Sequence, residues 1–152
     1  MAATYAAVSD VQARLTYETI DGSSNPNTTQ VTAWLEEGEA FVLGSLRAAG
    51  LDTSYDAGST GFKILTSWIV DYAEARVRIA WASAAGDGNP DGQDQLLQFK
   101  ETLAELRRNP ILYGEMLSAT GAVPDATQRV RTHVTDRSTT LQTTKIKLTE
   151  TF

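Results

Sequence analysis

The side chains best spaced for ligand binding lie in one short loop, which reads Asp87-Gly88-Asn89-Pro90-Asp91-Gly92. This order matches the first half of a calcium-binding loop, in which Asp87, Asn89 and Asp91 would supply the first oxygen ligands. The match fails at the twelfth position, because Gln98 cannot provide the bidentate carboxylate that completes such a site. We therefore expect no metal site. The pattern favours a helix that stops at Gly86 and a following helix capped by Asp91.

Few side chains are available for catalysis. His133 is the only histidine and the chain has no cysteine, so a Cys/His dyad is excluded and a Ser/His/Asp triad would depend on His133. No glycine-rich phosphate loop follows a predicted strand. Glu36, Glu37 and Glu39 cluster in one predicted helix, where a solvated or subunit-facing surface explains them better than an acid/base pair. The sequence predicts a protein that is not an enzyme and that uses no cofactor.

Charge is unevenly divided along the 152 residues. Residues 1–121 hold 16 acidic and 8 basic side chains, a net charge of −8, whereas residues 122–152 hold 3 acidic and 5 basic side chains, a net charge of +2. The acidic part is a poor ligand for phosphate backbones, which need clustered Lys and Arg. We therefore predict two units, a body over residues 1–121 and an arm over residues 122–152.

Neither a membrane span nor a secretory signal is predicted. No apolar run approaches the length that crosses a bilayer, and residues 1–7 lack the basic region and long apolar core of a signal peptide. The lack of cysteine fits a cytosolic origin. We expect no membrane partner.

The longest helical pattern runs from Thr60 to Ala85. At about 100° per residue, its charged side chains fall with Ser67 in one narrow strip, made of Lys63, Asp71, Glu74 and Arg78. The rest of its circumference is apolar, so other helices must cover several of its sides. The pattern predicts the central helix of a bundle.

Two helices are expected before it. A capping box at Ser9 and Gln12 predicts a short helix that ends near Tyr17. A second helix is predicted over residues 28–49, with Gly50 as its C-cap. Its inner stripe contains two small residues that allow close helix approach and several large ones: Val31, Trp34, Leu35, Gly38, Phe41, Val42, Ser45, Leu46 and Ala49.

Two more helices are expected after it, over residues 93–108 and 111–118. The first has an inner stripe of Leu96, Phe99, Leu103 and Leu106, and Pro110 is well placed to open the second. The predicted fold class is all-α, a small bundle of four to five helices with a long central helix. An extended, strand-prone C-terminal arm follows it.

The arm has a different composition from the body. Nine threonines lie between Thr127 and Thr151, and apolar residues alternate with polar ones in two short runs. This alternation predicts two weak strands that complete their pairing on another chain, and a disordered terminus is the alternative. The expected binding residues are Arg129, Val130, Arg131, Thr132, Val134, Lys145, Ile146, Lys147 and Leu148.

Three body residues are candidates for a subunit interface. Arg76 falls on the apolar side of the central helix, where a cation must snorkel outward, meet an acid of another helix or face a partner chain. Leu43 falls on the polar side of its helix, and Trp81 lies at the edge of the polar strip. A scattered surface leucine and a snorkelling arginine are the simpler alternatives.

The N-terminal third resembles a known family. Residues 5–15 contain the Ser9 capping box of the short first helix, and Thr19-Ile20 is expected to be extended. Residues 26–51 then continue through Gln30-Val31-Thr32-Ala33-Trp34-Leu35-Glu36-Glu37-Gly38-Glu39-Ala40 to Leu46-Arg47-Ala48-Ala49-Gly50-Leu51. This stretch resembles the head–tail connector (adaptor) proteins of long-tailed bacteriophages, small helical proteins attached below the portal. The order of helices continues to match to about Gly121.

The resemblance implies a structural virion protein made in the bacterial host cytoplasm. Such subunits form a dodecameric ring at the neck, between the portal protein and a neck or tail-completion protein, and genomic DNA passes through the ring without sequence recognition. The basic arm is similar to segments by which adaptors engage the portal or a neighbouring subunit. The alternatives are a small terminase subunit or helical DNA-binding regulator, and a tail terminator or other neck completion protein.

Overall fold

A computed structural model describes residues 4–15, 19–86 and 90–118 of the chain. Within these residues the protein has five helices: α1 (Val8–Arg14), α2 (Thr28–Ala49), α3 (Thr60–Ala85), α4 (Pro90–Arg108) and α5 (Pro110–Leu117). The described part contains no strand. An all-α body with a long central helix is therefore confirmed for the described residues, whereas the predicted arm lies outside them. None of the helices in the described ranges combines the length and apolar character needed to cross a bilayer.

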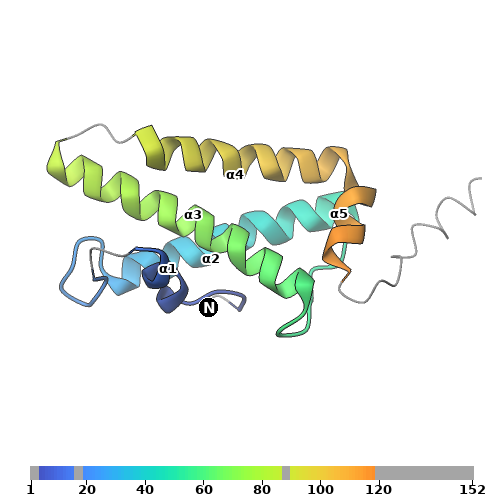
Figure 1. Cartoon of the computed structure of the whole chain (residues 1–152), viewed down its shortest axis with the longest axis horizontal. Helices are drawn as coiled ribbons and strands as arrows, with labels where there is room; N and C mark the ends of the chain where they lie inside the picture. The colour runs from blue at the N-terminus through green and yellow to red at the C-terminus, as the bar shows by residue number, and fades with distance from the viewer. Residues whose placement is uncertain (1–3, 16–18, 87–89, 119–152) are drawn as a thin grey trace, which may run out of the picture. The chain divides into compact units, whose positions relative to one another are not determined.

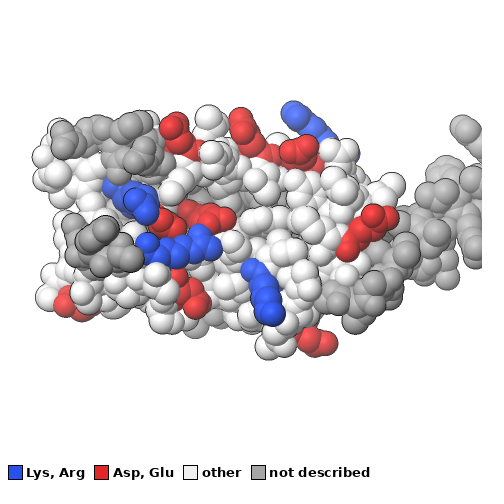
Figure 2. Space-filling model, in the orientation of Figure 1, with Lys and Arg blue, Asp and Glu red and all other residues white. Residues whose placement is uncertain are grey.

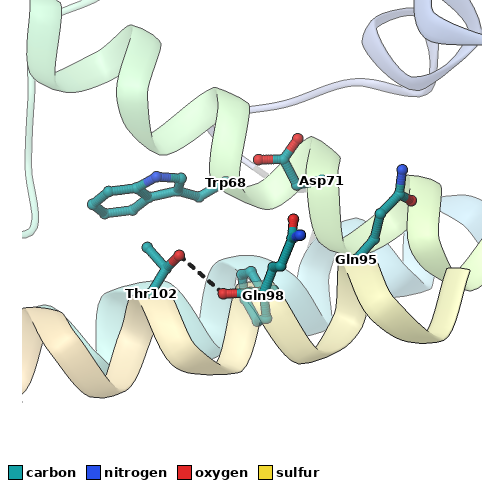
Figure 3. A pocket seen from close by; sticks show the side chains of 6 residues that line it. Trp68, Asp71, Gln95, Gln98 and Thr102 are labelled. Atoms are coloured by element: carbon teal, nitrogen blue, oxygen red, sulfur yellow. Dashed lines mark hydrogen bonds between the residues drawn. The ribbon is translucent and has the colours of Figure 1, made fainter. Parts of the chain in front are cut away.

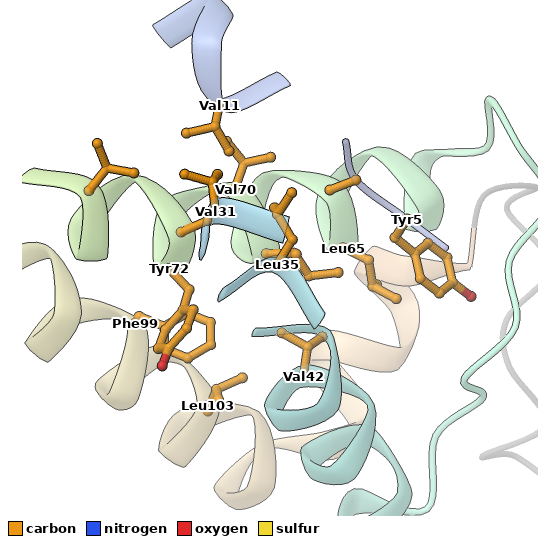
Figure 4. Packing of buried hydrophobic residues seen from close by; sticks show 14 of the residues in the cluster. Tyr5, Val11, Val31, Leu35, Val42, Leu65, Val70, Tyr72, Phe99 and Leu103 are labelled. Atoms are coloured by element: carbon orange, nitrogen blue, oxygen red, sulfur yellow. The ribbon is translucent and has the colours of Figure 1, made fainter. Parts of the chain in front are cut away.

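The central helix α3 packs against both α2 and α4, which also contact each other, and it crosses α2 diagonally in Figure 1. Its apolar residues Leu65, Ile69 and Val77 are fully buried, as its broad apolar circumference predicts. Helices α1 and α5 also contact α3. Figure 4 shows Val11 of α1, Val31 of α2 and Val70 of α3 packed together, so these three helices contribute to one core.

Local capping explains why the long helices begin and end where they do. Asn27 caps α2, because its side-chain oxygen accepts a hydrogen bond from the amide of Gln30 at 3.0 Å. The side-chain oxygen of Gln30 in turn accepts from the amide of Asn27, which completes a capping box. Ser59 caps α3 in the same way through the amide of Phe62. Gly50 ends α2 in the left-handed region, with φ of 72°, where a side chain would be strained.

Two predicted helix starts are wrong. The capping box at Ser9 does not form, because α1 begins after Ala7 and the carboxylate of Asp10 accepts from the amide of Ala7. Gln12 instead joins the end of α1 to the next segment: its side chain donates to the carbonyl of Leu15 and accepts from the amide of Ile20. Helix α1 therefore ends at Arg14 rather than near Tyr17.

Helix α4 begins at Pro90, three residues before its predicted start. Asp91 therefore lies inside the first turn and is not the N-cap. Gly92, which the calcium-like pattern treats as a turn residue, is buried where α4 approaches α3. A Cβ atom on Gly92 would lie 2.9 Å from Cγ1 of Ile79 and 3.0 Å from the carbonyl oxygen of Ala75. The glycine is needed for close helix packing.

Candidate functional site

An apolar groove opens between α2 and α4. We call it the α2/α4 groove, and its volume is about 270 Å³. Residues of α2, α3 and α4 line it: Phe41, Tyr72, Phe99, Lys100, Leu103, Ala104 and Arg107. Figure 4 shows three of these lining residues, Tyr72, Phe99 and Leu103, close together. The ring centroids of Tyr72 and Phe99 are 5.0 Å apart, and those of Phe41 and Tyr72 are 5.7 Å apart. Such aromatic pairs fix the shape of the groove.

Gly38 positions the rings of this groove. A Cβ atom there would lie 3.0 Å from Cδ1 of Tyr72, so the glycine lets α2 approach α3 closely, as its place in the apolar stripe predicts. One turn later, Phe41 extends past Tyr72 and is 47% exposed. The prediction that Phe41 belongs to the inner stripe is therefore wrong: Phe41 forms the rim of the groove.

Polar groups surround the groove on both sides. Burial, together with the nearby carboxylate of Glu37, raises the pKa of the Tyr72 hydroxyl to about 12. Arg107 donates to the hydroxyl of buried Ser45 at 2.9 Å, which fixes α4 against α2. Lys100 is exposed beside them. The groove thus combines an aromatic floor with two basic side chains on the α4 side.

A second apolar surface covers the outer face of α5. Its inner face is held by Gly114 and Leu117, which are buried, and by Tyr113, whose ring lies edge-on to Trp68 of α3 with centroids 6.0 Å apart. The opposite face carries Ile111, Leu112 and Met116, which are 58%, 61% and 42% exposed. Glu115 is exposed between them. We call these four residues the α5 ridge.

The three predicted interface residues each contact their own chain. The guanidinium of Arg76 lies 5.5 Å from the ring centroid of Trp34 and 6.0 Å from that of Tyr72, so a cation on the apolar side of α3 is accommodated by two aromatic faces. Leu43 and Trp81 are partly buried and pack against the core. Their role in a subunit interface stays a prediction.

The charged strip of α3 lies partly under α1. Arg14 forms ion pairs with Asp71 and Glu74, and it donates to the hydroxyl of Ser67 at 3.1 Å. Burial disfavours its charge, but hydrogen bonds and charges from Asp71 and Glu74 outweigh this and raise the pKa of Arg14. Glu74 is only 7% exposed and also pairs with Arg78 at 2.7 Å. The cluster attaches α1 to α3.

A small polar cavity of about 250 Å³ lies between α3 and α4, lined by Trp68, Asp71, Gln95, Gln98, Phe99 and Thr102 (Figure 3). The hydroxyl of Thr102 donates to the carbonyl of Gln98 at 2.9 Å. The side-chain oxygen of Gln95 is buried and accepts no hydrogen bond from the described part of the chain. One carboxylate, two amides and a hydroxyl can hydrogen-bond a small polar molecule, but they do not pair a nucleophile with a base.

The remaining predicted site residues either lie outside the described ranges or lie in a different secondary-structure element from the one predicted. Asp87, Asn89, His133 and all the predicted arm residues lie outside them. Asp91 lies in the first turn of a helix instead of in a loop. Within residues 4–15, 19–86 and 90–118, no three His, Asp or Glu residues gather closely enough to hold a metal ion.

The ion pairs of Arg14, the α2/α4 groove and the α5 ridge were not predicted from the sequence. A signal for the ridge exists, because residues 110–117 contain one charged residue and too many apolar ones for a single inner face. No family model, curated protein or solved structure matches this chain.

Proposed function

We propose that this protein is a structural subunit of a bacteriophage head–tail connector, which forms a ring below the portal and joins the DNA-filled head to the neck and tail. The observation that carries the proposal is that a helical body exposes two apolar surfaces, the α2/α4 groove and the α5 ridge. Exposed apolar surfaces of this kind mark interaction sites between proteins. The resemblance of residues 5–51 to connector proteins specifies the assembly.

The charge of the body suits a channel through which DNA slides. Residues 1–121 carry a net charge of −8, and on the face drawn in Figure 2 acidic and basic side chains are interspersed. A surface that lacks clustered cations does not condense onto a phosphate backbone. DNA would therefore pass through a ring of such bodies without being held by it.

The arm provides the second half of the proposal. Residues 122–152 carry a net charge of +2 and alternate β-branched with polar side chains, a composition suited to strand addition on a neighbouring protein. We assign attachment to the portal or a neighbouring subunit to this arm. The body then supplies the ring and the arm supplies its anchorage.

Deletion of residues 122–152 tests this division of roles. The truncated chain is expected to keep its helical circular dichroism spectrum and cooperative unfolding, because the described core lies within residues 4–118. It is expected to fail to co-sediment with portal-containing heads, whereas the full chain attaches. Attachment of the truncated chain at the level of the full chain would contradict the role of the arm.

Filter binding to duplex DNA at low salt tests the competing proposal, a small terminase subunit or helical DNA-binding regulator. The connector proposal predicts weak retention of DNA with little dependence on salt, because the body is acidic. Tight and salt-sensitive binding would instead favour the nucleic-acid function.

A further inference from the structure

We propose that the α5 ridge of one copy docks into the α2/α4 groove of a second copy, and that this contact links successive subunits. The inference deepens the proposed connector function, because it identifies which two surfaces meet in the ring. The occupant of the groove is therefore a second copy of this chain, and the contact is a short helix packed in an apolar groove.

The ridge and the groove both present apolar side chains that can pack against each other. The ridge presents Leu112 and Met116 four residues apart on one side of α5, the spacing of two anchors on one helix face. The groove offers an aromatic floor of Tyr72 and Phe99, bordered by the half-exposed ring of Phe41. Tyr72 and Phe99 are already buried within one copy, so docking would remove from water the exposed ring of Phe41 together with Leu112 and Met116.

The charges of the two surfaces are opposite. Glu115 is the acidic residue of the ridge and lies between its apolar side chains. Lys100 and Arg107 line the groove. Glu37 does not line the groove, and its carboxylate acts on the hydroxyl of Tyr72, where it raises the pKa of Tyr72. A ridge seated in the groove would bring Glu115 toward Lys100 and Arg107, which fixes the orientation of the docked helix.

The same charges disfavour contact between like surfaces. Two ridges packed together would oppose Glu115 to Glu115, and two grooves would oppose their basic side chains. The favoured contact joins different surfaces of the two copies, since the ridge belongs to α5 and the groove to α2, α3 and α4. A contact between different surfaces leaves each copy with a free ridge and a free groove, so it propagates and closes into a ring when the rotation permits.

Charge reversal in the full-length chain tests this contact by sedimentation velocity over a concentration series. Glu115→Lys and Lys100→Glu are each expected to weaken association by roughly tenfold or more, because each places like charges together. An equimolar mixture of the two single variants is expected to recover association to the wild-type level. In that mixture every ridge can find a groove of opposite charge. Glu101→Lys, which changes the net charge as Glu115→Lys does at another exposed site, is the matched control and is expected to associate as the wild type does.

Disulfide trapping covers the case of weak association, and the lack of native cysteine makes it specific. A full-length chain carrying both Leu112→Cys and Ala104→Cys is expected to form a ladder of covalent oligomers on mild oxidation. The single-cysteine variants should give no species above a dimer. A double variant that stays monomeric, or that stops at the dimer, would overturn the contact.

Failure of this contact is distinguishable from failure of the connector function. If rings are seen in particles but neither the charge variants nor the cysteine pair responds, the groove is not the subunit contact and the connector proposal stands. If the mixture of charge variants does not recover association, the pairing of Glu115 with Lys100 is wrong. Recovery in the mixture, together with the covalent ladder, would establish the contact.

Discussion

Single residues determine how closely the helices of this protein approach each other. A Cβ atom on Gly61 would lie 2.4 Å from the ring of Tyr55 and 2.5 Å from the carbonyl oxygen of Leu117. Gly44, in contrast, has open space around it. The two glycines therefore have opposite effects on stability, because one is needed for packing and the other only adds backbone entropy to the unfolded chain.

Gly61→Ala is expected to lower the free energy of unfolding by about 1–3 kcal/mol, since the added methyl group forces α5 and Tyr55 away from α3. Gly44→Ala is expected to raise it by about 0.5–1 kcal/mol, because alanine is the better helix former in open space. Urea unfolding followed by circular dichroism measures both. Equal effects of the two substitutions would show that Gly61 is not a contact point.

Tyr72 gives the stability of the body a dependence on alkaline pH. Burial and the carboxylate of Glu37 raise the pKa of Tyr72 from 10.0 to about 12 in the folded state. The unfolded chain therefore loses this proton first, so the contribution of Tyr72 is complete below pH 10 and is lost as the pH rises through 12. Urea midpoints between pH 9 and about 12 should fall less steeply for Tyr72→Phe than for the wild type. Parallel slopes would contradict the raised pKa.

At this scale the sequence predicts part of the site and misses the rest. Gly38 and the odd position of Arg76 follow from helical periodicity, because both depend on which face of one helix a residue occupies. The partners of Arg14 do not follow, because Asp71 and Glu74 are 57 and 60 residues away in sequence and meet it only when α1 lies on α3. Pairing between helices depends on the tertiary arrangement, which periodicity does not specify.

Elements are held together at the N-terminus by a few specific bonds. The hydroxyl of Tyr5 donates to the carbonyl of Thr53 at 2.7 Å and accepts from the amide of Tyr55 at 3.1 Å. Thr66 of α3 donates to the carbonyl of Tyr5, and Glu39 of α2 accepts from the amide of Thr4. The segment before α1 is therefore attached to α2, to α3 and to the loop between them.

Tyr5→Phe should remove two of these bonds while keeping the ring, whose centroid lies 5.1 Å from that of Phe62. The partly buried carbonyl and amide lose their partner, so we expect a loss of about 1–3 kcal/mol in the free energy of unfolding. Hydrogen exchange should accelerate most in residues 4–15 and 51–58. An unchanged exchange pattern would show that Tyr5 does not attach this segment.

Helix boundaries were predictable where capping residues act locally. Gly50 and Gly86 end α2 and α3 as predicted, because a left-handed residue after an apolar run is specified by the local sequence. The starts of α1 and α4 were not predictable in this way. Ser9 and Asp91 are good N-caps by type, but the chain enters both helices earlier than these residues. The exposure of Phe41 likewise depends on where α4 lies.

The described part of the chain is a helical body with two apolar surfaces, and the predicted arm, residues 122–152, has the opposite net charge by sequence. The proposed function assigns each a role: the groove and ridge link copies, the acidic body lets DNA pass, and the arm anchors the ring. The resemblance to connector proteins predicts the ring but not its contacts, because no motif in the sequence marks them. The helical part of the fold was predictable, and the surfaces emerged only from the packed helices.

Cryo-electron microscopy of the particle that contains this protein is the most direct test of the connector function. Averaging around the portal axis should reveal a ring of this chain at the lower end of the portal. Helices of about the lengths of α2, α3 and α4 should be visible in each subunit, and the arm should be ordered against a neighbouring protein. A particle in which this chain is absent from the portal vertex, or is present there as isolated copies without a ring, would contradict the account.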